Sequence, residues 1–159
     1  MAIAILTVGV SGCGKSTICK KLFSSTVYNH LERDAIRIEL MGGINNFCWE
    51  KWDFNRESEV TEIYQKKLHS IIERNENMCL SDTWLNPKFR TEMFQHLKDA
   101  GYAIKVMFID TPVEECLERN RKRGNLMVKE KIILKMKGYA QQYNVIKEEE
   151  SEQYGYELL

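Results

Sequence analysis

Residues 9–16 form the pattern with the most chemical content in the chain. They read Gly-Val-Ser-Gly-Cys-Gly-Lys-Ser, which satisfies G-x-x-x-x-G-K-[ST] between an apolar run and a helical pattern. Glycines let the backbone curl so that its N–H groups face phosphates, and the following helix adds its positive N-terminal end. Lys15 should reach the β and γ phosphates, and the Ser16 hydroxyl should ligate Mg²⁺. The pattern predicts ATP binding through Gly9, Ser11, Gly12, Cys13, Gly14, Lys15, Ser16 and Thr17.

Nucleotide binding does not define the reaction, because GTPases, motor ATPases and kinases share this loop. The chain has no N-K-x-D sequence for base recognition and no apolar run that ends in D-x-x-G. At 159 residues it is also too short for most ring ATPases. The class of P-loop protein that remains is a small kinase. Its chemistry requires a carboxylate that takes a proton from the acceptor and mobile arginines that hold phosphates.

A carboxylate and an arginine that suit this chemistry follow the second apolar run. Asp34 and Arg37 are three residues apart, so their side chains share one face of a helix. Asp34 could accept the proton of the attacking hydroxyl, while Arg37 could hold a phosphate or another anion of the acceptor. An N-capping aspartate in a surface ion pair would explain the same spacing.

Two further polar segments complete the candidate site. Asp82 follows the third apolar run, and ligands of open parallel sheets gather beyond the carboxyl ends of strands. It could orient magnesium-bound water or the acceptor, or it could close a turn with Thr83. Arg119 and Arg123 are four residues apart in a basic run that ends at Gly124. This run predicts a mobile lid over the phosphates, although most basic runs are solvated faces.

The elements that must position these groups alternate between apolar strand-like runs and helical patterns, which is typical of a parallel α/β sheet. The sequence predicts a three-layer P-loop kinase fold with a mostly parallel, about four-stranded sheet that is flanked by helices and carries an arginine-bearing lid. Strands are expected near Ala2 to Val8, Val27 to Leu31, Met78 to Ser81 and Tyr102 to Ile109. Helices are expected near Lys15 to Phe23, Asp34 to Met41, Asn55 to Asn75, Pro87 to Ala100, Pro112 to Arg121 and Lys129 to Tyr143.

Two of these helices carry start signals. Asn86 precedes Pro87, and Thr111 precedes Pro112, so each pair offers a side-chain acceptor at the N-cap and a proline at the first helical position. The segment 42–54 has no clear period and predicts a long surface excursion. Its two tryptophans are expected to pack against the protein more than to stack on a ligand.

Composition places the chain among single-domain globular proteins, with 43% hydrophobic and 29% charged residues. Five scattered cysteines without a C-x-x-C pair argue against a disulfide framework or a zinc site and favour a reducing, cytoplasmic setting. We expect no signal peptide and no membrane span. The net charge is zero, but residues 147–159 hold one lysine and five glutamates. The chain therefore divides into a P-loop kinase domain, residues 1–146, and an acidic C-terminal tail, residues 147–159.

Four stretches in this order resemble the 5′-kinase domain of bacteriophage polynucleotide kinases: GVSGCGKST, LERDAIR, LSDTWLNPKFR and RNRKRG. They span roughly the first 125 residues. The resemblance implies ATP- and magnesium-dependent phosphorylation of the 5′-hydroxyl end of DNA or RNA, in nucleic acid repair within the host cytoplasm. It also implies residue roles: Lys15 and Ser16 hold phosphates and magnesium, Asp34 is the general base, Arg37 contacts an acceptor phosphate, Asp82 organises the site, and Arg119 and Arg123 hold the phosphates of ATP.

The chain departs from this family at its end, since longer members continue into a D-x-D-G-T phosphatase domain that this sequence lacks. We therefore expect no phosphatase activity. A homo-oligomer is compatible with the resemblance. Two other functions stay open: phosphorylation of a hydroxymethylated DNA base, a free nucleoside or a small metabolite, and a nucleotide-binding switch without catalysis.

Overall fold

Five parallel strands form a single sheet in the computed structural model, which describes residues 1–159. The strand order is β2-β3-β1-β4-β5, and each neighbouring pair is parallel. The strands are β1 (Ile3–Gly9), β2 (Tyr28–Leu31), β3 (Asn77–Leu80), β4 (Ala103–Ile109) and β5 (Glu157–Leu158). The predicted α/β fold is confirmed, and its sheet has one strand more than expected. The fifth strand has two residues, which is too short to leave a periodic pattern in the sequence.

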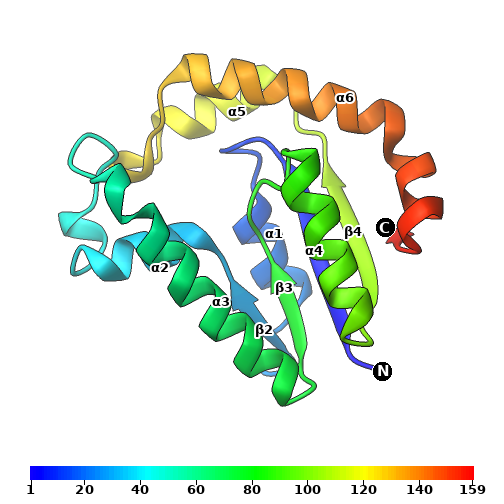
Figure 1. Cartoon of the computed structure of the whole chain (residues 1–159). Helices are drawn as coiled ribbons and strands as arrows, with labels where there is room; N and C mark the ends of the chain where they lie inside the picture. Colours follow the sequence, from blue (N-terminus) through cyan, green and yellow to red (C-terminus); the bar gives the residue numbers. More distant parts are fainter.

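Six helices surround this sheet near the predicted positions, but the last of them continues past its predicted end at Tyr143 and into the acidic segment (Figure 1). They are α1 (Lys15–Leu22), α2 (Arg33–Leu40), α3 (Glu57–Glu73), α4 (Pro87–Asp99), α5 (Val113–Arg121) and α6 (Glu130–Tyr154). Short 3₁₀ turns are η1 (Ile44–Asn46), η2 (Phe54–Arg56) and η3 (Gly124–Leu126). Figure 1 shows α3 and α4 on one face of the sheet, while α5 and α6 arch beyond the carboxyl ends of the strands. None of the helices combines the length and the apolarity that a membrane crossing requires.

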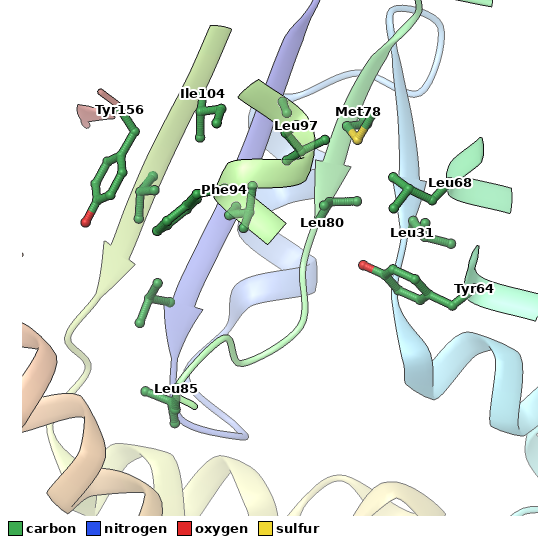
Figure 2. Packing of buried hydrophobic residues seen from close by; sticks show 14 of the residues in the cluster. Leu31, Tyr64, Leu68, Met78, Leu80, Leu85, Phe94, Leu97, Ile104 and Tyr156 are labelled. Carbon is green, nitrogen blue, oxygen red and sulfur yellow. The ribbon is translucent and has the colours of Figure 1, made fainter. Parts of the chain in front are cut away.

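The central strand β1 is buried at six of its seven positions because both faces of the sheet are covered. Ala4, Leu6 and Val8 belong to the large core beneath α3 and α4, whereas Ile5 packs on the opposite face with Cys19 of α1. Figure 2 shows the large core, where Phe94 of α4 contributes a buried ring. Two separate apolar clusters, one on each face, define the three layers.

The two predicted helix starts have different outcomes. Asn86 caps α4, since its Oδ1 accepts hydrogen bonds from the backbone N–H of Lys88 at 3.0 Å and of Phe89 at 3.4 Å. The prediction for Thr111 is wrong: α5 begins at Val113 with Pro112 as its N-cap, and no side chain caps it. The Thr111 hydroxyl instead donates to the carbonyl of Cys13 at 3.0 Å, so a tertiary partner replaces the local one.

The segment 42–54 packs on the protein through its aromatic residues. Phe47 and Trp52 are buried, and the rings of Phe47 and Trp49 meet edge to face at 5.3 Å. The guanidinium of Arg37 lies over the Trp49 ring at 5.1 Å from its centroid. Both tryptophans therefore pack against the protein, as predicted, and the excursion has a small core of its own.

The acidic residues 147–159 lie within the fold. They form the end of α6 and the strand β5, which pairs with β4. Glu150 is buried and accepts two hydrogen bonds from Arg90 of α4, from Nε and Nη2, both at 2.8 Å. Arg90 also donates to the carbonyl of Trp84 at 2.9 Å and lies over the Tyr143 ring. This segment differs from the rest of the sequence in its charge, but the buried ion pair connects it to α4 and to the loop that follows β3.

Candidate active site

The glycine-rich loop connects β1 to α1 and has backbone angles that only glycine adopts easily. Gly12 has φ 83° and Gly14 has φ 95°, both in the left-handed region. A Cβ on Gly12 would lie 2.9 Å from the carbonyl oxygen of Cys116. The loop therefore curls tightly against α5, and a side chain at position 12 would force the two apart.

Three hydrogen bonds hold this loop in place from outside. The Thr111 hydroxyl and Arg119 Nη1 each donate to the Cys13 carbonyl at 3.0 Å. The backbone N–H of Gly9 donates to the Thr83 carbonyl at 3.1 Å. The loop is thus tied to the segments that follow β3 and β4, which fixes its position relative to the rest of the candidate site.

Lys15 is folded back across this loop. Its side chain is almost fully buried, and Nζ donates to the Val10 carbonyl at 2.9 Å. An ammonium has three donors, so others stay available after this bond. The loop geometry therefore holds a positive charge among the backbone N–H groups of residues 10–14, where anionic oxygens would bind.

The Ser16 hydroxyl meets a carboxylate that sequence analysis did not single out. It donates to Glu32 Oε2 at 2.6 Å, and the Ser81 hydroxyl donates to the same oxygen at 2.9 Å. Glu32 directly follows β2, and Ser81 directly follows β3. The position of Glu32 at a carboxyl strand end was the available signal, but its partners lie 16 and 49 residues away.

Asp34 and Arg37 form the pair that their spacing predicts. Arg37 Nη1 donates to Asp34 Oδ1 at 2.7 Å. Glu57 of α3, a further residue that sequence analysis missed, accepts from Arg37 Nε at 3.0 Å and from Nη2 at 2.5 Å. Burial opposes the charge of the guanidinium, but its hydrogen bonds to Glu57 and Asp34 and the charges of these carboxylates outweigh burial and raise the pKa of Arg37. Arg37 is therefore a fixed cation next to a carboxylate.

Asp82 lies beyond β3 and connects it to α2. Its Oδ1 accepts a hydrogen bond from the backbone N–H of Arg33 at 2.8 Å, while Oδ2 is buried without a partner. The Tyr64 hydroxyl is also buried and lies beside this carboxyl without a hydrogen bond of standard geometry. Burial raises the pKa of Asp82 to about 6, and the charges of Glu32 and Asp34 act in the same direction. This carboxyl therefore titrates close to neutral pH.

The two predicted lid arginines lie at the end of α5 and just beyond it. Arg119 is on the helix and contacts the glycine-rich loop, as described above. Arg123 follows the helix, and its Nη1 is buried without a hydrogen-bond partner. Asn120 holds together the two ends of residues 121–127. Its side chain donates to the Val128 carbonyl at 2.8 Å and accepts from the Val128 N–H at 2.9 Å. An unpartnered buried N–H is costly, so the position suits an anionic ligand.

The structure thus gathers most predicted residues at one edge of the sheet. Lys15 and Ser16 lie in and after the loop from β1, Asp34 follows β2, and Asp82 follows β3. This edge is formed by the carboxyl ends of parallel strands, where α/β proteins bind ligands. Ser11 is half-buried in the loop, and Thr17 is exposed in the first turn of α1 without a side-chain hydrogen bond.

Comparison with known proteins identifies a family that covers most of the chain. Residues 5–143 match the family AAA_33, described as an AAA domain. A protein of Autographa californica nuclear polyhedrosis virus, named for polynucleotide kinase and RNA ligase activities, is 29% identical over 129 residues. That match covers 76% of this chain and 18% of the viral protein, so the chain spans less than a fifth of this relative's length.

Similar folds occur among solved structures. A chain in the structure of the Pnkp1/Rnl/Hen1 RNA repair complex superposes with a TM-score of 0.76 at 19% identity, over 90% of this chain and 45% of that chain. Deoxyadenosine kinase from M. mycoides has a TM-score of 0.59 at 15% identity, over 99% of this chain and 89% of that one. At these identities the likeness establishes the fold alone.

The four sequence stretches predicted a narrower family, the bacteriophage polynucleotide kinases. The match to AAA_33 supports the broader family and does not by itself establish the narrower one. The similarity to named polynucleotide kinases is distant. The match over residues 5–143, together with the glycine-rich loop and the parallel sheet, shows that the chain belongs to the AAA domain family AAA_33 and is a P-loop kinase domain.

Proposed function

We propose that this chain is a polynucleotide 5′-hydroxyl kinase, which transfers the γ-phosphoryl group of ATP to the 5′ end of DNA or RNA. The observation that carries the proposal is the contact between Asp34 and Arg37, whose charged groups lie 2.7 Å apart at the carboxyl edge of the sheet. A 5′ end offers a hydroxyl and, one nucleotide further, a phosphodiester anion. The carboxylate suits the first group and the guanidinium suits the second.

Arg37 keeps the capacity to bind this anion although it is paired. A guanidinium has five N–H donors, and the bonds to Asp34 and Glu57 use three of them. The Trp49 ring supports its planar face, and the two carboxylates fix its orientation. The remaining N–H groups are therefore held in place for a phosphodiester.

The residues around the loop fit ATP and magnesium. ATP supplies the phosphoryl group, and magnesium neutralises charge on its phosphates when bound. The Ser16 hydroxyl and the Glu32 carboxylate offer the oxygen ligands that Mg²⁺ prefers, directly or through water. The unpartnered Nη1 of Arg123 offers a donor for a phosphate oxygen, and Arg119 lies beside the loop. Lys15 and the loop N–H groups complete the phosphate site.

Asp34 acts as the general base in this proposal. The acceptor O–H gives its proton to the Asp34 carboxylate while the acceptor oxygen forms a bond to the γ phosphorus. The bond between that phosphorus and the bridging oxygen of ATP breaks, and ADP leaves. Arg37 stays charged throughout, because its pKa is raised. Asp82 anchors the start of α2 through the N–H of Arg33, which positions the next residue, Asp34.

The relatives support the same acceptor. The viral protein is named for polynucleotide kinase activity, and the solved complex with the similar fold is named for RNA repair. Both names refer to nucleic acids. A free nucleoside is the second candidate acceptor, and the observation that favours it is a pocket of about 660 Å³ beside Asp82, which is large enough for a small molecule.

The test is transfer of labelled γ-phosphate from ATP and magnesium to matched oligonucleotides that end in a 5′-hydroxyl or a 5′-phosphate, as both DNA and RNA. Labelling of only the 5′-hydroxyl strands is the expected result. Asp34→Asn should lower transfer by roughly 10²- to 10⁴-fold, the usual contribution of a general base, with ATP binding unchanged. Asp99→Asn, which changes an exposed aspartate at the end of α4, serves as the matched control.

Two results would contradict the proposal. If ATP binds but no oligonucleotide is labelled, strand ends are not the acceptor, and adenosine and deoxyadenosine are tested in the same assay. If Asp34→Asn transfers phosphate at the wild-type rate, Asp34 is not the general base.

A further inference from the structure

A pocket of about 660 Å³ lies between α3 and α4, beyond the carboxyl end of β3. Of the residues that sequence analysis proposed for the site, only Asp82 lines it. Figure 2 shows Tyr64 projecting from α3 towards β3 in this region. The walls are side chains of α3 and α4, and the inner end is the segment that follows β3, with Tyr64, Leu68, Asp82, Trp84, Phe89 and Met93 as the main lining residues.

The lining is suited to a planar ring. Trp84 and Phe89 are aromatic, and Phe89 is 60% exposed although it is large and apolar. Leu68 and Met93 add aliphatic surface from the two helices. Ligand pockets of this size commonly combine such apolar walls with a few polar groups. A flat heterocycle could therefore stack on this surface.

The charges around the pocket disfavour a phosphate. Three carboxylates line it, from Glu57, Asp82 and Glu92, against a single arginine. That arginine, Arg33, is engaged by α3, since its Nη2 donates to the Thr61 hydroxyl at 3.1 Å and lies 3.7 Å from Glu57. The lining therefore carries more negative than positive charge, and an uncharged ligand fits it better than an anion.

Two polar groups lie beside each other in the pocket wall. The Tyr64 hydroxyl and the Asp82 carboxyl are close enough that each shifts the pKa of the other, although Tyr64 Oη and Asp82 Oδ2 are buried without a hydrogen bond of standard geometry. A hydroxyl can donate and accept, while a carboxylate oxygen accepts. The exposed amide of Gln65 lines the same wall and offers both a donor and an acceptor, which match the mixed polar groups on the edge of a nucleobase.

The pocket adjoins the proposed acceptor site. Glu57 lines its wall and is hydrogen bonded to Arg37, which in turn contacts Asp34. Asp82 and Arg33 link the inner end of the pocket to the start of α2. The Glu57 carboxylate in the pocket wall is therefore connected to the proposed base, Asp34, through a single guanidinium.

We propose that this pocket binds the nucleobase of the acceptor nucleotide, either at the end of a strand or in a free nucleoside. This inference rests on the proposed function, in that the base in the pocket belongs to the nucleotide whose sugar carries the 5′-hydroxyl that Asp34 deprotonates. The terminal base leaves its neighbours and enters between α3 and α4. The charged backbone of a strand stays outside the pocket, on the side of Arg37.

The experiment compares two DNA oligonucleotides that both end in a 5′-hydroxyl, one with an ordinary terminal nucleoside and one with an abasic terminal sugar. Stacking of a base on aromatic side chains is usually strong enough that the wild type should prefer the ordinary end by roughly tenfold or more in kcat/KM. Met93→Trp fills the pocket and should remove this preference while keeping transfer to the abasic end. Gln95→Trp, on the exposed side of the same helix, should keep the preference.

The results separate this inference from the proposed function. If the wild type labels both ends equally well, or if Met93→Trp keeps the preference, the pocket does not bind the base, although the kinase activity stands. Should Met93→Trp fail to fold, His96→Trp fills the pocket from an exposed position of α4. The same outcomes then apply to that variant.

If no oligonucleotide is labelled, the strand-end function fails and the pocket is tested by calorimetric titration with adenosine, guanosine, cytidine and uridine. Binding to the wild type that is lost in Met93→Trp would keep the pocket as a nucleobase site and assign it to free nucleosides. If none of the four nucleosides binds, the pocket proposal is overturned.

Discussion

The ion pair between Arg90 and Glu150 gives the sharpest prediction for stability. Its side chains are only 1% and 6% exposed, so water cannot replace either partner. Glu150 accepts two hydrogen bonds from the guanidinium and a third from the Tyr156 hydroxyl at 3.1 Å. Glu150→Ala would leave the charge of Arg90 buried with the Trp84 carbonyl as its remaining hydrogen-bond acceptor.

Loss of one partner of a buried ion pair costs about 3–5 kcal/mol, because the charge that remains is desolvated and uncompensated. For a chain of this length, each kcal/mol lowers Tm by roughly 2–4 °C. Glu150→Ala should therefore lower the free energy of unfolding by about 3–5 kcal/mol. The corresponding drop in Tm is roughly 6–20 °C.

Urea unfolding at pH 7, followed by far-UV circular dichroism, measures this change. The control is Glu149→Ala, which removes an exposed glutamate from the neighbouring position of α6. Arg90→Met combined with Glu150→Leu should recover much of the lost stability, since no buried charge remains. If Glu150→Ala is as stable as Glu149→Ala, or if the double variant is no better than Glu150→Ala, the reasoning about an unpaired buried charge is refuted.

Two further predictions concern the candidate site. Because burial raises the pKa of Asp82 to about 6, the folded protein binds this proton more tightly than the unfolded chain, and the carboxylate costs stability as pH rises from about 4 to above 6. The asparagine in Asp82→Asn does not titrate. Between pH 4 and pH 7.5 the free energy of unfolding of this variant, measured with urea, should therefore rise relative to that of the wild type by up to about 3 kcal/mol. A difference between the two proteins that does not change with pH would argue against this explanation. Glu32→Gln removes the charge that holds the Ser16 hydroxyl, so the magnesium concentration for half-maximal phosphate transfer should rise by roughly 10- to 100-fold, the usual cost of losing a group that orients a metal ligand. Magnesium titrations of the transfer rate with Glu39→Gln, an exposed glutamate of α2, as control would show this, and an unchanged magnesium dependence would exclude the role.

The elements of the fold could be predicted because each depends on neighbours along the chain. The run of apolar residues in β1 predicted a buried parallel strand, and the glycine pattern predicted the curled loop. Asn86 capped α4 as expected, since its partners are two and three residues away. The same local rule predicted Thr111 as an N-cap, and this prediction is wrong because the Thr111 hydroxyl donates to the Cys13 carbonyl, 98 positions earlier in the chain.

The candidate site divides in the same way. The sequence by itself determined the loop from Gly9 to Ser16 and the pairing of Asp34 with Arg37, because backbone conformation and one helical turn fix both. Only the tertiary structure decided that Glu32 meets Ser16, that Glu57 holds Arg37, and that α3 and α4 leave a pocket beside Asp82. It also decided that Glu150 pairs with Arg90 across 60 residues of chain. These contacts depend on how the helices pack across the sheet, and the spacing of residues within a single segment does not predict that packing.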